Sequence, residues 1–325
     1  MEQRPTGNPR RAKPRSTRLD PVFLIACLLS ISLPNEARSH GVLGTRFFPS
    51  TLTIEDPFAN DELSLLGGFI EEPGEAGEPS ARVVGLEVEY AKTILPRVAL
   101  SIGDEFSFVD PRGGKTKRGT GNLELGVKIQ SYTNDSTETV LSTSLGIAIG
   151  KTGDTDLEAD DFSTLSPALL LGQGFGGLPD SAGFLRPLAL VGLLELDIPV
   201  EAASHVDGER ERHSITTGWG FAILYDLHYL QTSVRDMKIR APFNRIVPLV
   251  EVAGETCLHR GCSGDTTGYV SPGLIWIGRK FQLGAEARIP INDRTGDDVG
   301  VLLQVHLYLD DLFPDSLGRP LFMSD

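Results

Sequence analysis

The sequence has few cysteines, a shortage of positive charge and, after residue 33, no long apolar run. Only three of the 325 residues are cysteine, so a scaffold built on many disulfides is excluded. Beyond residue 39 no apolar segment approaches the about 20 residues that a membrane-spanning helix needs. If this part of the chain crosses a bilayer, it must do so as a closed β-barrel, in which each strand pairs its backbone with its neighbours.

The charge balance excludes several kinds of partner. The chain has 30 Lys and Arg against 44 Asp and Glu, a net charge of −14. Residues 1–39 contain seven of the bases and three of the acids, so the rest of the chain carries a net charge of −18. Nucleic acid and anionic membrane surfaces are poor partners for such a charge. We therefore expect no nucleic-acid partner.

The first 39 residues predict an export signal. Six bases precede residue 20, and the apolar run Pro21–Leu33 follows them. Ala37-Arg38-Ser39 then fits the small-x-small rule for signal peptidase, which places cleavage after Ser39. The apolar run is too short to span a bilayer as a helix. Cys27 lies early in this run, which leaves lipidation as a minor alternative.

The rest of the chain shows the two-residue period of amphipathic strands. From Val299 to Asp310 one set of alternate positions is wholly apolar, and the other includes Gln304, His306 and Tyr308. Strand-like segments recur at 82–94, 97–109, 121–132, 138–150, 164–176, 185–200, 213–230, 245–257, 266–279, 281–292 and 298–310. Single-chain bacterial barrels have even strand numbers. We expect twelve strands, with the missing one at 60–71 or 231–240, and ten strands as the alternative.

The connections between these segments alternate in length. Short turns fall at Leu95-Pro96, Asn134-Asp135 and Lys280, whereas longer polar loops fall at 111–120, 151–163, 201–212 and 258–265. This asymmetry is typical of outer-membrane barrels. We predict an all-β protein, a transmembrane antiparallel up-and-down β-barrel over 82–310. The signal peptide is 1–39, a periplasmic lead-in or partial plug is 40–81, and a C-terminal tail is 311–325. A soluble periplasmic β-sandwich is the alternative fold.

Cys257 and Cys262 enclose four residues between two predicted strands. In an oxidising compartment such a pair is expected to form a disulfide that closes a loop tip. Zinc is a weak alternative, because His259 is the only nearby imidazole and no fourth protein ligand is evident.

No segment contains a complete motif for catalysis or for cofactor binding. Gly114-Lys115-Thr116 resembles the end of a phosphate loop, but Val109 stands where that loop requires glycine. The acidic stretch Asp154–Asp161 lacks the central glycine and terminal glutamate of a calcium loop. We expect no enzymatic activity, no cofactor and no metal site.

If the apolar set of each strand faces outward, charged side chains face the interior of the barrel. The inward set contains nine acids, two bases and one histidine: Glu87, Glu89, Glu105, Glu124, Lys128, Glu195, Asp197, Glu251, Glu255, Glu286, Arg288 and His306. Such an interior predicts a pore that favours cations or neutral polar solutes. The alternative is a narrow barrel that is filled by ion-paired and hydrogen-bonded side chains. Asp104 falls on the apolar face, which predicts a bulge or an interface position there.

Three segments resemble outer-membrane β-barrels of the phenol-degradation meta-pathway (MetA-pathway) type. They are Gly121–Lys128 (G-N-L-E-L-G-V-K), Val247–Glu251 (V-P-L-V-E) and Ser271–Gly278 (S-P-G-L-I-W-I-G), the last leading into Phe281–Gly284. The likeness covers roughly residues 82–310 and carries over no functional residue. It implies a porin-like transporter for small solutes in the outer membrane of a Gram-negative-type bacterium, in contact with membrane lipid and lipopolysaccharide. A structural or anchoring outer-membrane protein is the alternative function. The sequence specifies neither the substrate nor the oligomeric state.

Overall fold

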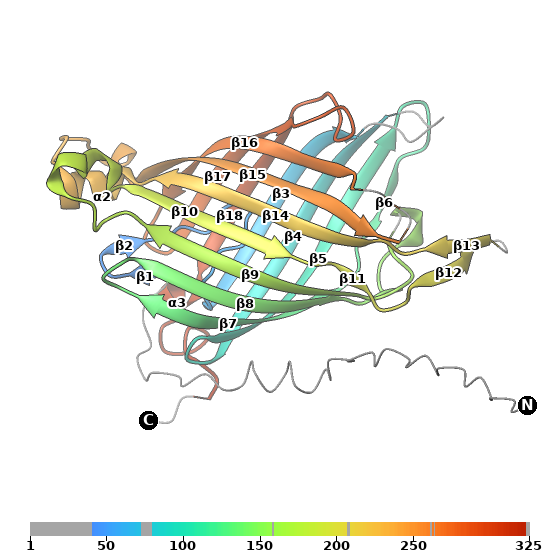
Figure 1. Ribbon diagram of the computed structural model, residues 1–325, viewed down its shortest axis with the longest axis horizontal. Coiled ribbons are helices and arrows are strands. Elements are labelled where there is room, and N and C mark those ends of the chain that lie inside the picture. The colour runs from blue at the N-terminus through green and yellow to red at the C-terminus, as the bar shows by residue number, and fades with distance from the viewer. Residues whose placement is uncertain are drawn as a thin grey trace, which may run out of the picture. The chain divides into compact units, whose positions relative to one another are not determined.

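Twelve antiparallel strands close into one barrel in the computed structural model, which describes residues 41–72, 80–157, 159–206, 209–260, 262 and 264–322 (Figure 1). The last strand pairs with the first, from Val301 opposite Phe69 to Tyr308 opposite Glu62, and this pairing completes the ring. The predicted signal peptide, residues 1–39, lies outside the described residues. The barrel strands are β3 (Glu62–Glu72), β4 (Ala81–Leu95), β5 (Val98–Pro111), β7 (Glu124–Asn134), β8 (Thr139–Ala148), β9 (Thr164–Gly174), β10 (Leu188–Glu195), β14 (Ile215–Tyr225), β15 (Ile246–His259), β16 (Thr266–Ile277), β17 (Phe281–Pro290) and β18 (Gly300–Tyr308).

The two ends of the barrel differ in their connections. At one end, which we call the loop end, lie β6 (Lys117–Thr120), η1 (Thr155–Leu157), β11 (Ile198–Pro199), β12 (Ala203–Val206) and β13 (Glu209–Arg212). At the other, the turn end, lie β1 (Val42–Leu43), β2 (Arg46–Phe47), η2 (Asp180–Leu185), α2 (Leu227–Tyr229), η3 (Leu230–Val234), η4 (Phe243–Arg245) and α3 (Leu309–Leu312). Short turns join β4 to β5, β7 to β8 and β16 to β17 at the turn end, as the sequence predicts. The β9–β10 and β14–β15 connections at the same end are long, so the predicted asymmetry between the two ends holds only in part.

Among the described residues, no helix has the length and apolar character that crossing a membrane would require.

The prediction of twelve strands is confirmed, but the predicted start of the barrel at residue 82 is wrong. Each of the eleven predicted segments overlaps a barrel strand, and the twelfth is β3, which overlaps the suggested range 60–71. Gly67 and Gly68 interrupt the apolar alternation of β3, which hides its strand pattern in the sequence. The other suggested range, 231–240, contains no strand. Helix α2 lies just before this range and continues into η3, and Asp226 caps α2 by accepting hydrogen bonds from the backbone N–H groups of His228 (2.7 Å) and Tyr229 (3.0 Å).

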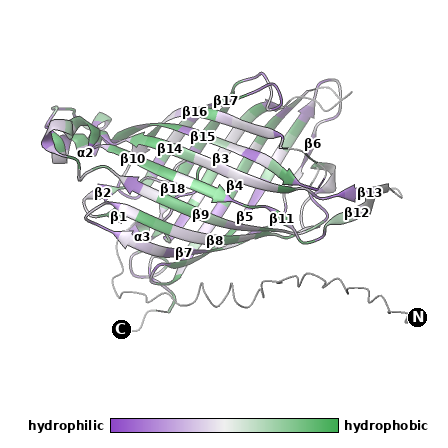
Figure 2. Cartoon of the chain, viewed as in Figure 1, coloured by the Kyte–Doolittle hydropathy of each residue, from purple (hydrophilic) through white to green (hydrophobic). Residues whose placement is uncertain are grey.

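The outward face of the barrel is apolar. Large apolar side chains stand exposed at alternate positions, for example Leu86 (46%), Leu169 (49%) and Leu303 (58%). Figure 2 shows hydrophobic residues along the strands and hydrophilic residues at the loops, including the β12–β13 hairpin. An apolar surface of this extent is unfavourable in water and is typical of a wall that faces lipid. The exterior is therefore that of a transmembrane barrel.

Residues 41–61, which we call the inner segment, lie inside the barrel. Their apolar side chains pack against inward side chains of β8, β10, β14, β15, β16 and β18. This core consists of Leu43, Phe48, Leu52, Ile54 and Phe58 together with Val140, Ala189, Val191, Ala222, Leu224, Val247, Leu249, Ile275 and Leu302. The predicted lead-in therefore divides into two parts, an inner segment arranged as a partial plug and the barrel strand β3.

Arg46 ties the inner segment to the turn end. Its guanidinium is fully buried and forms an ion pair with Glu138, with 2.7 Å between Nε and Oε2. It also donates hydrogen bonds to the carbonyl oxygens of Arg186 and Pro187 and lies 4.2 Å from the ring centroid of Tyr229. One side chain thus joins the inner segment to the β7–β8 turn, the β9–β10 connection and α2.

Asp104 lies at a change of strand partner and not at a bulge. The register between β4 and β5 is continuous at Asp104, so the predicted bulge is wrong. Along its opposite edge, β5 pairs with β7 as far as Gly103 and with β6 from Phe106 onward. The ladder along this edge of β5 is therefore interrupted beside Asp104.

Cys257 and Cys262 are joined at the loop end, and their Cα atoms are 5.9 Å apart. We expect mass spectrometry of the non-reduced protein to find one peptide pair that is linked through these two cysteines, because the loop closes over only four residues in an oxidising compartment. Two alkylatable thiols in protein purified without reductant would rule this bond out.

Candidate functional site

Two cavities lie inside the barrel, one on each side of the inner segment, and ten of the twelve predicted interior side chains line them. Glu124, Glu195, Asp197 and Glu255 line the larger cavity. Glu87, Glu105, Arg288 and His306 line the smaller one, and Glu89 and Lys128 line both. Glu251 and Glu286 lie elsewhere, buried near the inner segment. The structure thus brings the predicted residues together in three groups.

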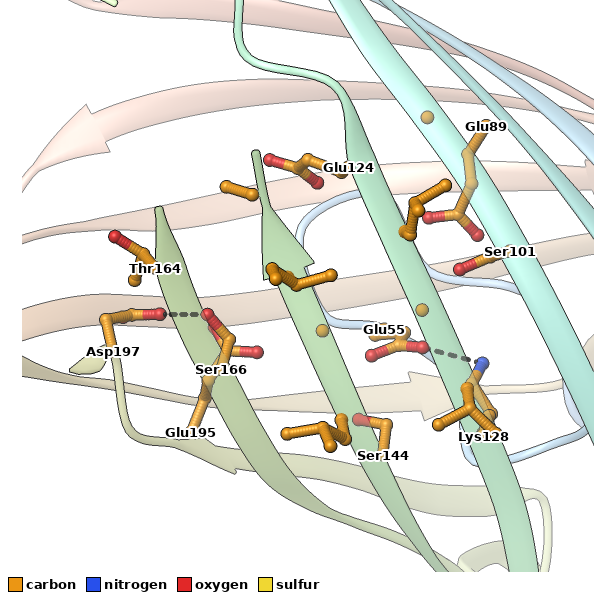
Figure 3. A pocket seen from close by; sticks show the side chains of 18 of the residues that line it. Glu55, Glu89, Ser101, Glu124, Lys128, Ser144, Thr164, Ser166, Glu195 and Asp197 are labelled. Atoms are coloured by element: carbon orange, nitrogen blue, oxygen red, sulfur yellow. Dashed lines mark hydrogen bonds and ion pairs between the residues drawn. The ribbon is translucent and has the colours of Figure 1, made fainter. Parts of the chain in front are cut away.

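The larger cavity has a volume of about 540 Å³ and lies between the inner segment and strands β4, β5, β7, β8 and β9. Small inward side chains leave this space open: Ala91, Ala99, Ser101, Gly103, Gly126, Ser144, Gly146 and Ala148. Figure 3 shows Glu55, Glu89, Glu124, Glu195 and Asp197 around it, the last accepting a 2.6 Å hydrogen bond from Ser166. Small residues on the wall and carboxylates around the space create a polar chamber.

The lining of the larger cavity is strongly acidic. Its described lining includes eight carboxylates, those of Glu55, Glu62, Glu89, Glu124, Asp160, Glu195, Asp197 and Glu255. Lys128 is the one Lys or Arg in that lining. Its Nζ lies 2.8 Å from Oε1 of Glu55 and donates a hydrogen bond to the carbonyl oxygen of Asp56 at 2.9 Å. The single ammonium is therefore engaged by the inner segment, and carboxylates far outnumber Lys and Arg in the described lining.

The smaller cavity, of about 470 Å³, lies on the other side of the inner segment, toward β3, β4, β5 and β18. Glu55, Glu62, Glu89 and Lys128 line both cavities, so the partition between them is narrow. Arg288 lies 3.9 Å from the ring centroid of Tyr269, which holds its guanidinium against the wall.

Glu251 holds the middle of the inner segment. This carboxylate is fully buried and accepts backbone hydrogen bonds from Leu52 (2.9 Å), Thr53 (2.8 Å) and Ile54 (3.0 Å). Glu286, on β17, is 3% exposed and interacts with Glu251. A carboxylate that accepts three N–H groups makes a strong charge-assisted contact. Glu251 therefore anchors the inner segment and does not line open space.

Polar side chains of β17 and β18 extend this anchor. Gln282 and Gln304 donate hydrogen bonds to the carbonyl oxygens of Ser50 and Thr51. His306 is 2% exposed, with its Nε2 3.3 Å from Oε2 of Glu62. Gln304 and His306 also line the smaller cavity, so this side of the interior combines the anchor of the inner segment with open space.

A third cavity, of about 230 Å³, lies at the turn end. Phe58 and Asn60 line both this cavity and the larger one, so these two residues stand between them. The side chain of Phe58 is buried and packs on Phe48, with 5.6 Å between the ring centroids. The three cavities together extend from Asp160 and Phe162 at the loop end to the turn end.

Sequence reasoning missed the acids that the inner segment and its neighbours contribute. Glu55 and Asp56 belong to the part read as a lead-in, and Glu62 belongs to the unrecognised strand β3. Asp160 lies in a loop, where burial raises the pKa of its carboxyl group above the usual value. Within the described ranges, no group of three or more His, Cys, Asp or Glu side chains is placed to hold a metal ion.

Comparison with known proteins supports the fold. No protein-family profile matches the sequence, and no curated protein is similar to it. An outer membrane channel from Pseudomonas putida F1 superposes with a TM-score of 0.56 at 10% identity, covering 81% of this chain and 99% of the channel. The NanC porin (TM-score 0.45, 8% identity, 76% and 98% covered) and the KdgM porin (0.42, 10%, 76% and 98%) overlap less well. At such low identity the channel shows a shared fold alone, that of an outer-membrane barrel.

Proposed function

We propose that this chain is an outer-membrane channel that passes small solutes and favours cations or neutral polar solutes over anions. The observation that carries the proposal is the larger cavity, in which eight carboxylates face a single ammonium that is already paired. A charged lining in a narrow, low-dielectric bore attracts ions of the opposite sign and repels ions of its own.

The arrangement of the cavities supports a restricted path. A solute that enters between Asp160 and Phe162 at the loop end would reach Phe58 and Asn60, beyond which the third cavity leads to the turn end. We infer that the inner segment, which contributes Phe58 and Asn60, restricts this path to small solutes.

The apolar outer belt, the barrel fold and the predicted signal peptide support an outer-membrane location. The sequence resemblance to meta-pathway barrels supports the narrower assignment as a transporter of that type. Outer-membrane lipid and lipopolysaccharide are the expected surroundings. We propose no enzymatic activity, cofactor or metal.

A structural or anchoring role is the second candidate, and one observation favours it. The inner segment occupies part of the interior and is held there by hydrogen bonds to Glu251, Gln282 and Gln304. A barrel in which the open cavities never join would conduct no ions, so conductance distinguishes the two roles.

Removing three carboxylates from the larger cavity is expected to weaken its preference for cations. The triple variant Glu89→Gln, Glu124→Gln and Glu195→Gln keeps the side-chain volumes and should move the reversal potential in a KCl gradient toward zero, because the field along the bore falls. Planar-bilayer recordings provide the measurement.

The matched control removes three exposed carboxylates of the β17–β18 loop, in Asp293→Asn, Asp297→Asn and Asp298→Asn. It should change the reversal potential much less, since these side chains do not line the cavities. Equal shifts in the two triple variants would mean that surface charge, and not the cavity, sets the selectivity.

A further inference from the structure

We propose that the turn end has a binding site for the phosphate groups of anionic phospholipids in the adjacent membrane leaflet. The site consists of six bases, Arg235, Lys238, Arg240, Arg245, Arg279 and Lys280, which we call the basic collar. They belong to the β14–β15 connection, residues 226–245, and to the turn between β16 and β17. This inference goes beyond solute passage and requires only that the barrel spans a membrane.

A hydrogen bond places the β14–β15 connection against the lipid-facing wall. Trp276 lies on the outward face of β16, and its Nε1 donates to the carbonyl oxygen of Pro242 at 3.2 Å. Its ring also packs on Phe281 of β17, with 5.6 Å between the centroids. Since tryptophan and other aromatic residues gather where lipid tails meet head groups, this contact sets the connection at head-group level.

Exposed apolar side chains continue the lipid-facing belt into this connection. Phe243, next to Pro242, is 64% exposed, and Met237 is 45% exposed. Phe184 of the neighbouring β9–β10 connection is 52% exposed. Apolar side chains next to bases are the composition of a segment that lies in the membrane interface.

The basic collar is a local exception in an acidic chain. Within these two connections six bases stand against two acids, Asp226 and Asp236, whereas the whole chain has a net charge of −14. In the described part of the chain, none of the six bases forms an ion pair with a carboxylate. Arginine and lysine next to a membrane bind phosphate groups and attract anionic lipids. The unpaired bases and the lipid-facing aromatics therefore fit a phospholipid head group.

Four bases also lie in one loop at the loop end, at Arg112, Lys115, Lys117 and Arg118. Arg112 is already paired with Glu71, and Asp110 lies close by, accepting a 3.0 Å hydrogen bond from Thr116. The bases of this loop, residues 112–118, therefore provide a matched control of equal charge.

The test measures lipid retention by native mass spectrometry of the full chain in detergent, with short-chain phosphatidylglycerol or phosphatidylcholine added. The wild type should retain phosphatidylglycerol in preference to phosphatidylcholine. The variant Arg240→Gln, Arg245→Gln, Arg279→Gln and Lys280→Gln should lose this preference by at least about fivefold, since each base near an anionic head group contributes to its attraction. The control variant Arg112→Gln, Lys115→Gln, Lys117→Gln and Arg118→Gln should keep the wild-type preference.

Three results would overturn the proposal. One is equal retention of phosphatidylglycerol by the wild type and the collar variant, and another is an equal loss in the loop-end control. The third is complete competition by inorganic phosphate at millimolar concentration, which would identify a site for free anions. If heat-modifiable migration on gels shows that the fourfold variant does not fold, the double variant Arg279→Gln and Lys280→Gln is measured instead, with a smaller loss expected.

Discussion

Replacing Glu251 with alanine is expected to release the inner segment and to raise the single-channel conductance. The N–H groups of Leu52, Thr53 and Ile54 would lose their common acceptor. Hydrogen bonds to charged groups contribute about 1.5–3 kcal/mol each, and water in the lumen offsets part of the loss, so we expect a net cost of about 3 kcal/mol. That cost shifts the equilibrium between the bound and the released state of the inner segment by roughly a hundredfold. Planar-bilayer recordings should show larger or more frequent openings.

Glu105→Ala is the matched control for this substitution. Glu105 is also an inward carboxylate, but its described hydrogen bond comes from Ser107 on its own strand and not from the inner segment. Its removal should leave the conductance near that of the wild type. If Glu251→Ala folds and conducts as the wild type does, the inner segment does not restrict the path in the way proposed.

Placing arginine on the two faces of the wall is expected to give opposite results. Ala285 lies exposed near the middle of β17, so Ala285→Arg puts a charge into hydrocarbon and should cost about 2–4 kcal/mol of folding stability. Ala148 of β8 lines the larger cavity opposite Glu124, and Ala148→Arg puts the same charge beside a carboxylate in a wet space. We expect this second substitution to change stability by no more than about 1 kcal/mol.

Unfolding in urea from lipid vesicles, followed by tryptophan fluorescence, measures both variants. The two substitutions are chemically identical, so the difference between them reports the environment of each position. Equal losses of stability, or a larger loss for Ala148→Arg, would show that the two faces are assigned the wrong way round.

The strand pattern was predictable because a lipid-facing wall imposes a strict alternation. In β17 the apolar positions Leu283, Ala285 and Ile289 face outward, and the intervening positions carry the polar groups. The same rule placed ten interior residues along the two cavities. The rule did not identify β3 as a strand, because Gly67 and Gly68 have no side chain that would mark one face as apolar and the other as polar.

The inner segment could not be predicted from strand periodicity, because its contacts join residues far apart in the sequence. Leu52 and Glu251 are separated by 199 positions, and no local pattern links them. An indirect signal was present in strands β10, β14 and β15, whose inward positions include Val191, Leu224 and Val247. Apolar residues on both faces of a strand require a partner on the inner side as well as lipid on the outer side. The inner segment is that partner.

Single-channel recording of the wild-type full-length protein in a planar bilayer, under a KCl gradient, tests the central claim most directly. The account predicts discrete openings and a reversal potential whose sign shows preference for K⁺ over Cl⁻, since carboxylates dominate the lining of the larger cavity. An absence of openings in protein whose barrel is shown to be folded, or a reversal potential that favours Cl⁻, would contradict it.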